Sequence, residues 1–171
     1  RVLRGTGDVT GTKDSSLGGI TRRCGTLFLN DLSSIKWGKI MTPVFVCLTS
    51  TGVALARQLA TNFPGAVVHG LEGRTSGTDV SFAKTLPHLQ DLFRNDRPVI
   101  GVCAAGILIR AVAPLVQNKK IDPPVIALAD DGSCVVPLLG GHRGGNALAQ
   151  QIGKLLKIDA FSRLFEIIFL G

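Results

Sequence analysis

Residues 135–146 read VVPLLGGHRGGN, and this stretch organises the interpretation of the chain. The apolar run Val135–Leu139 leads through glycines and the pair His142–Arg143 into a segment with helical spacing of apolar residues. Asn146 stands where a helix N-cap is expected, able to accept hydrogen bonds from the first unpaired backbone N–H groups. A strand–glycine–helix junction presents such donors and the positive end of a helix dipole to an anion. The same pattern is equally typical of a tight glycine turn whose histidine and arginine are only solvated.

Outward from this stretch, the chain alternates apolar strand-like runs with helical segments. The expected strands lie at 44–48, 66–70, 97–103, 125–129 and 134–139. A helix is expected over about 80–93, with Phe82, Leu86, Leu89 and Phe93 facing inward. The pattern predicts an α/β fold, a three-layer open and mostly parallel sheet of the flavodoxin or Rossmann-like type. The short turn at 130–133 predicts one antiparallel neighbouring pair.

The two ends differ from this regular pattern. Residues 1–40 show no sustained period, and the chain's single methionine, Met41, stands where the alternation begins. We expect 1–40 to be a leader, non-native or disordered, with a genuine N-terminal extension as the alternative. The α/β domain is expected over 41–157. Residues 158–171 form an atypical apolar tail, compatible with a last packed helix or with a truncated or frame-shifted end.

Composition excludes several classes of function. The 171 residues are 45% hydrophobic and 18% charged, which is typical of a folded domain. The net charge of +7 is spread over both the leader and the domain, without basic residues interleaved with aromatics, so a nucleic-acid partner is not predicted. The four cysteines have no CxxC spacing, and Cys47, Cys103 and Cys134 lie in apolar runs, so buried free thiols are expected. The histidines predict no metal site. No membrane-spanning run or signal peptide is present, so we expect a cytoplasmic protein with no membrane partner.

Three loops of small residues precede expected helices, at Thr49–Gly52, Ala104–Gly106 and 140–146. Ligands of open parallel sheets bind where strands end and helices begin, which makes these loops candidate anion sites. None matches a P-loop or a dinucleotide fingerprint. Arg110 lies in an apolar helical segment and is expected either to reach the surface or to bind an anion. His69 and His88 are expected to be structural or exposed.

The order of several short motifs resembles the N-terminal region of cobalamin biosynthesis protein G, the cobalt-precorrin-5A hydrolase family. Similar segments also occur fused to precorrin-3B C17-methyltransferase. The motifs are Ala104–Ile107, Arg110, Ala113–Leu115, Lys119–Lys120, Asp122–Pro123, Leu138–His142 and Gly144–Ala149. The resemblance is strongest over roughly 97–156 and looser back to Met41.

This resemblance implies binding of a polycarboxylate cobalt tetrapyrrole, opening of its ring-A lactone by water and release of acetaldehyde. It implies no cofactor, because the cobalt is carried by the substrate. His142 becomes the candidate acid/base or orienting residue, with Arg110 and Arg143 as carboxylate clamps. The candidate substrate-binding residues are Thr49, Ser50, Ala104, Ala105, Gly106, Arg110, Gly140, Gly141, Arg143, Gly144, Gly145 and Asn146.

Three functional hypotheses remain open. The chain is a lactone hydrolase of the corrin pathway, a non-catalytic tetrapyrrole-binding fragment of a fused methyltransferase, or a generic anion- or nucleotide-binding α/β domain. The expected partners are a cobalt-precorrin intermediate and either other corrin-pathway enzymes or a missing C-terminal domain. This family usually continues beyond the last helix into further domains, whereas this sequence ends at Gly171.

Overall fold

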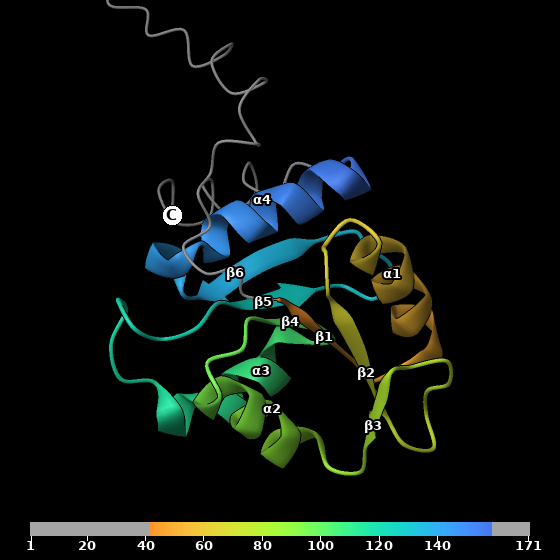
Figure 1. Cartoon of the computed structure of the whole chain (residues 1–171), viewed down its shortest axis with the longest axis horizontal. Coiled ribbons are helices and arrows are strands. Elements are labelled where there is room, and N and C mark those ends of the chain that lie inside the picture. Colours follow the sequence, from red (N-terminus) through yellow and green to blue (C-terminus); the bar gives the residue numbers. More distant parts are fainter. Residues whose placement is uncertain (1–41, 159–171) are drawn as a thin grey trace, which may run out of the picture. The chain divides into compact units, whose positions relative to one another are not determined.

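The computed structural model describes residues 42–158, which contain a sheet of order β3-β2-β1-β4-β5-β6 (Figure 1). The first five strands run parallel, and β6 runs antiparallel to β5. The mixed sheet agrees with the predicted fold class and with its one antiparallel pair. The strands are β1 Val44–Cys47, β2 Val67–Leu71, β3 Val80–Phe82, β4 Val99–Val102, β5 Val125–Leu128 and β6 Val135–Leu139.

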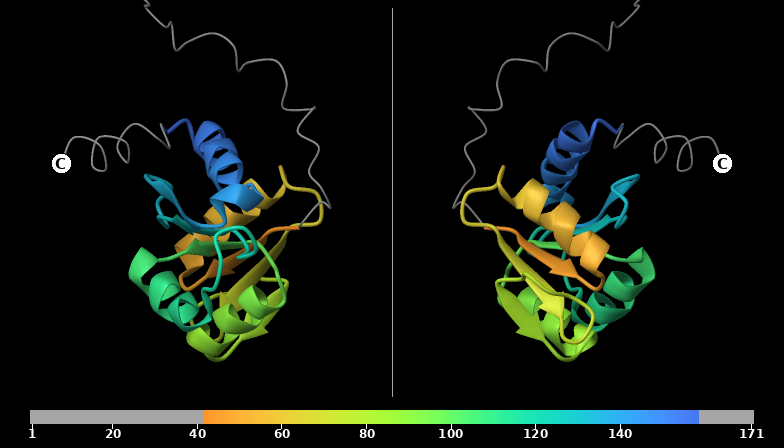
Figure 2. Two further views of the ribbon diagram at one scale, coloured as in Figure 1. Left: turned by 90° about the vertical axis from the view of Figure 1, so that its left-hand side faces the viewer. Right: turned by 90° about the vertical axis from the view of Figure 1, so that its right-hand side faces the viewer.

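Helices cover both faces of the sheet, which gives the three layers seen in Figure 2. Helices α1 and α4 pack with one set of strand side chains around Phe45, Ile100 and Ile126. Helices α2 and α3 pack with the alternate set around Val46 and Val99 on the other face. The helices are α1 Ser50–Ala60, α2 Thr85–Arg94, α3 Ala105–Val112 and α4 Gly145–Leu156, with short 3₁₀ turns η1 Ala113–Leu115 and η2 Gly141–Arg143.

The prediction of a helix over 80–93 is wrong for its first residues. Val80–Phe82 is an edge strand paired in parallel with β2, and the helix begins only at Thr85. Of the four residues expected inside, Phe82, Leu89 and Phe93 are buried, whereas Leu86 is 47% exposed. The β-branched valine and the aromatic phenylalanine of this triplet favour a strand, and β2 offers an edge with which the triplet can pair. Tertiary pairing therefore overrides the helical period at this point.

The order of the strands creates a switch point between β1 and β4. From β1 the chain moves to β2 and β3 on one side, then returns through α2 to β4 on the other. The helix that follows β1 packs on one face and the helix that follows β4 packs on the other. In open α/β sheets, the carboxyl ends of strands at such a point are the usual place for a ligand.

The antiparallel strand β6 ends at the opposite edge from the parallel strands. Leu139, its last residue, pairs with Val125, the first residue of β5, with an irregularity in the ladder next to Pro137. We call the edge where β1–β5 end the carboxyl edge, and the edge where they begin the amino edge. The loop that follows β6 therefore lies at the amino edge.

Within residues 42–158, no helix combines the length and apolar character needed to cross a bilayer. The same residues contain no cluster of three or more metal-ligating side chains. Almost all of the expected leader and apolar tail lie outside the described residues. Ile158, the first residue of the expected tail, packs partly buried against the α1–α4 side of the core.

Candidate functional site

At the carboxyl edge, the loop after β1 begins α1 with a conventional cap. Thr49 Oγ1 accepts the backbone N–H of Gly52 at 3.0 Å, and Thr49 O accepts that of Val53 at 3.1 Å. Ser50 donates its hydroxyl to Arg74 O at 3.1 Å. Within residues 42–158, the backbone N–H groups of Ser50 and Thr51 have no acceptor. This helix start is exposed and open to solvent.

The loop after β4 begins α3 without a side-chain cap, since Ala104 precedes the helix. Ile107 N donates to Ala104 O at 3.0 Å, and in the described part of the chain the N–H groups of Ala105 and Gly106 have no acceptor. Arg110 is exposed and its Nη1 lies 3.4 Å from Gly106 O. The guanidinium of Arg110 thus lies at the surface beside the start of α3. This is the first of the two alternatives that the sequence left open for Arg110.

Two cysteines lie at this switch point, Cys47 as the last residue of β1 and Cys103 directly after β4, and neither is activated as a nucleophile. Burial raises the pKa of the Cys47 thiol to about 12 and that of the Cys103 thiol to about 11. Cys47 Sγ is directed to Gly52 O at 3.5 Å. Both groups stay protonated at neutral pH. The prediction of buried thiols is correct for Cys47, whereas Cys103 is only partly buried and Cys134 is exposed.

The glycines of loop 140–146, at the amino edge, have packing roles. Gly140 has φ +72°, and a Cβ there would lie 2.5 Å from Pro124 Cα. A Cβ on Gly145 would lie 2.8 Å from Leu139 O. Gly144 has φ +91° and is itself the N-cap of α4, so Asn146 is not the cap but the second residue of the helix. Because the left-handed Gly144 ends the 3₁₀ turn and already occupies the cap position, the predicted asparagine cap does not form.

Arg143 joins three loops at this edge. Its guanidinium pairs with both carboxylate oxygens of Asp96, with Nη2 2.9 Å from Oδ2, and donates to Ile121 O at 2.6 Å. Hydrogen bonding to the Asp96 carboxylate raises the pKa of Arg143 above its usual range. A bidentate pair of this kind fixes geometry as well as charge. The charge expected to hold a substrate carboxylate is thus already paired within the protein.

His142 precedes Arg143 in the chain but takes no part in this ion pair. Its side chain is exposed, and within the part of the chain that the structure describes it has no hydrogen bond or ion pair. The neighbouring backbone is held in place, since the N–H groups of Arg143 and Gly145 both donate to Gly140 O at 2.9 Å. The loop therefore presents a free imidazole on a fixed backbone.

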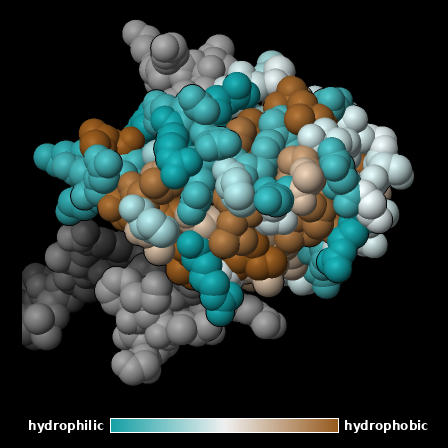
Figure 3. All heavy atoms as spheres, turned by 90° about the horizontal axis from the view of Figure 1, so that it is seen from below, coloured by the Kyte–Doolittle hydropathy of each residue, from teal (hydrophilic) through white to brown (hydrophobic). Residues whose placement is uncertain are grey.

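An apolar hollow of about 360 Å³ lies between the outer side of α3 and strand β6. Its lining residues are Ile109, Val112, Ala113, Val116, Leu138 and Leu139. Ile109 is 51% exposed and Val116 43% exposed. Figure 3 views the face covered by α2 and α3 and shows hydrophobic surface among the hydrophilic side chains there. The hollow is open, so a flat apolar ligand would lie on it rather than inside it.

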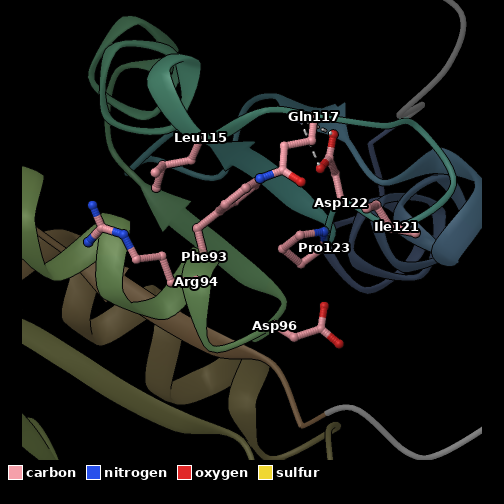
Figure 4. Close-up of a pocket in the computed structure, with 8 residues that line it drawn as sticks. All are labelled: Phe93, Arg94, Asp96, Leu115, Gln117, Ile121, Asp122 and Pro123. Carbon is pink, nitrogen blue, oxygen red and sulfur yellow. Dashed lines mark hydrogen bonds between the residues drawn. The ribbon is translucent and has the colours of Figure 1, made fainter.

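A second, more polar hollow of about 270 Å³ lies on the other side of the 115–117 segment (Figure 4). Its lining residues are Phe93, Arg94, Asp96, Leu115, Gln117, Ile121, Asp122 and Pro123. Asp122 is buried and accepts the backbone N–H groups of Gln117 and Asn118, the latter at 3.0 Å. Lys119 and Lys120 are exposed in the same connection. Both hollows therefore border residues close in sequence or contact to loop 140–146.

The structure separates the predicted site residues into two groups. Thr49, Ser50, Ala104–Gly106 and Arg110 lie at the carboxyl edge, whereas 140–146 lies at the amino edge. A strand of four residues spans about 13 Å, and both faces of the sheet are covered by helices. One ligand cannot contact both groups without crossing the core.

Sequence reasoning missed a histidine pair on the α2–α3 face. His69 Nδ1 lies 2.9 Å from His88 Nε2, and the His88 ring stacks on Phe82 with centroids 4.3 Å apart. Burial lowers the pKa of His69 to about 4 and also lowers the pKa of His88. The residues are 19 positions apart, one on β2 and the other on α2, so only the folded chain brings them together.

Comparison with known proteins finds similarity over the loop after β4 and loop 140–146. Residues 87–162 match the family described as cobalamin synthesis G N-terminal. This part of the chain resembles the N-terminal region of cobalamin synthesis G. The matched residues include the start of α3 and the whole of loop 140–146, so both edges contribute to the match.

Two curated relatives of the chain carry the same name. The chain is 38% identical over 117 residues to the cobalt-precorrin-5A hydrolase of Salmonella typhimurium, and 29% identical over 119 residues to that of Priestia megaterium. Each alignment covers 66% of this chain and 32% of the relative. The chain thus spans about a third of the length of the curated relatives it matches.

A solved structure shares the fold. The crystal structure of a cobalamin biosynthesis protein G homologue from Sulfolobus solfataricus has a TM-score of 0.52 and 18% identity. The likeness covers 74% of this chain and 40% of that chain. At this level of identity the agreement concerns the fold alone.

Proposed function

We propose that this chain acts in cobalamin biosynthesis as a cobalt-precorrin-5A hydrolase-type domain. The observation that carries the proposal is the 38% identity to a curated hydrolase, together with a family match that includes loop 140–146. The substrate would be a cobalt tetrapyrrole with acetate and propionate side chains. Water would open its ring-A lactone, and the two-carbon fragment would leave as acetaldehyde.

We assign the macrocycle to the amino edge rather than to the carboxyl edge. The amino edge combines a free imidazole at His142 with two hollows, one of them apolar. Exposed Lys119 and Lys120 offer cations to peripheral carboxylates. The pair Arg143–Asp96 would hold the loop in shape, and His142 would act as acid/base or orienting residue.

The cobalt would be supplied by the substrate, and the protein would need no cofactor of its own. Partners would be the tetrapyrrole and either other corrin-pathway enzymes or a further domain of the kind that the longer relatives have room for. A cytoplasmic location would suit this pathway role.

The proposal is tested with the purified chain and cobalt-precorrin-5A. Acetaldehyde is followed through a coupled alcohol dehydrogenase, and the corrinoid spectrum is recorded in the same cuvette. Acetaldehyde above the no-protein control supports hydrolysis by this domain. A spectral change without acetaldehyde would instead indicate a tetrapyrrole-binding module. If a folded sample gives neither signal, the proposal is wrong.

The role of His142 is tested with His142→Ala in the same assay. Because the imidazole is exposed and makes no hydrogen bond or ion pair within the described residues, its removal should leave the fold unchanged. We expect loss of binding or of turnover. A variant that keeps both at the wild-type level would remove His142 from the site.

A further inference from the structure

We propose that His142 orients the substrate by binding its cobalt as an axial ligand. This inference rests on the proposed function, because it requires a cobalt tetrapyrrole as substrate. It gives the side chain a defined contact, from a ring nitrogen to the metal, where the proposed function leaves its role open between acid/base and orientation.

The availability of the imidazole is the first argument. The chain has three histidines, and His69 and His88 use one ring nitrogen each in the bond between them. His142 is exposed, and no protein group in residues 42–158 occupies either of its ring nitrogens. Neutral imidazole is among the commonest protein ligands of transition metals and suits cobalt.

The fixed backbone is the second argument. Gly140 O accepts the N–H groups of Arg143 and Gly145, both at 2.9 Å. The next residue, Arg143, is tied to Asp96 and to Ile121 O. A ligand held on a rigid loop loses little freedom when it binds its metal, which favours coordination over a mobile surface histidine.

The apolar hollow is the third argument. Leu138 and Leu139 line it, and the chain continues directly from Leu139 through two glycines to His142. Across the hollow, Ile109 and Val116 expose further apolar surface. A tetrapyrrole has an apolar face with the metal at its centre and carboxylates at its rim. The chain therefore offers an apolar surface that ends three residues before the imidazole, and Lys119 and Lys120 lie in the connection that Arg143 contacts at Ile121 O. These groups are of the kinds that such a molecule needs.

The chemical step is a ligand exchange without oxidation or reduction. The neutral imidazole donates the lone pair of one ring nitrogen to the cobalt, and a weakly held axial water leaves. The macrocycle is thereby fixed above the loop with its rim free to meet water. His142 then acts as a positioning group for the reaction at ring A.

The test uses the untagged full chain and cobyrinic acid reduced to the Co(II) state, a cobalt corrinoid that has carboxylates but no axial base of its own. Binding is measured by the corrinoid absorbance, and coordination by electron paramagnetic resonance. Coordination by one ¹⁴N should split each cobalt line into a triplet. Protein labelled with ¹⁵N in histidine only should convert that triplet into a doublet.

The His142→Ala variant should lose the nitrogen splitting, whereas Gln150→Ala, an exposed change on α4, should keep it. Binding without nitrogen splitting in the wild type would overturn this inference and leave the proposed function standing. Splitting that persists in His142→Ala would also overturn it, since another residue would be the ligand. If the folded chain binds no cobyrinic acid, both this inference and the assignment of a corrinoid substrate are wrong.

Discussion

The two edges of the sheet carry similar sequences and have different structures. At the carboxyl edge, small residues leave helix starts open, and a Cβ on Gly106 would meet only the flexible end of Arg110 at 3.2 Å. At the amino edge, Gly140 and Gly145 are pressed against backbone atoms and Arg143 is already paired. The contrast shows that a glycine-rich motif can be shaped by packing. His142 makes no hydrogen bond or ion pair within residues 42–158, and for this reason the proposed site is centred on it.

The largest expected effect is on stability at Gly140. Gly140→Ala would place a Cβ 2.5 Å from Pro124 Cα on a residue with φ +72°. We expect the free energy of unfolding to fall by about 3 kcal/mol, from left-handed strain and overpacking together. Urea denaturation followed by circular dichroism measures this. A loss below about 1 kcal/mol would mean that the loop is loose and free to adapt to a ligand.

A second effect concerns pH and the histidine pair that links β2 to α2. The folded pKa of His69 is about 4, below the ordinary value of about 6.5, so the unfolded chain binds more protons between these values. Stability should therefore fall as the pH drops from about 6.5 to about 4, and His69 alone should contribute roughly 3 kcal/mol of this loss at most.

Denaturation midpoints over this pH range should drop in the wild type and vary less in His69→Asn, which lacks the titrating ring. His142→Ala serves as the control, because that imidazole lies outside the pair. A pH dependence of the same size in His69→Asn would assign the effect to other groups.

A smaller effect is expected at Arg143. Arg143→Ala removes the guanidinium that joins Asp96 to Ile121 O. Because Asp96 is largely exposed, we expect a loss of only about 1 kcal/mol in the free energy of unfolding. Corrinoid binding should weaken with it as the loop loosens. Arg143→Lys should restore little of either property, since lysine cannot form the two parallel bonds. Binding lost at unchanged stability would return Arg143 to direct substrate contact.

The smallest effect is expected at Gly106. Gly106→Asp adds a negative charge in the first turn of α3, where there is room and where a helix tolerates it, so stability should change by less than about 1 kcal/mol. Since we assign the substrate to the amino edge, corrinoid binding should stay unchanged. Gly106→Ala controls for size without charge. Binding lost in Gly106→Asp alone would move the anionic substrate to the carboxyl edge.

The apolar runs predicted five strands correctly because buried strands need continuous hydrophobic side chains. The three-residue strand β3 was too short to separate from the helix behind it. The placement of 140–146 was implicit in the sequence, since an antiparallel last strand must end at the opposite edge. Contacts such as Arg143–Asp96, 47 positions apart, depend on the assembled sheet and leave no local pattern.

Pro137 limits how the outer strand β6 can pair with another strand. It stands in the middle of β6, opposite Ile126, and has no N–H to offer to an additional strand. The other outer strand, β3, is only three residues long. A proline on one side and a very short strand on the other make the sheet a poor template for pairing with neighbouring molecules. The domain is thereby protected against aggregation through its own sheet, even with apolar surface exposed beside β6.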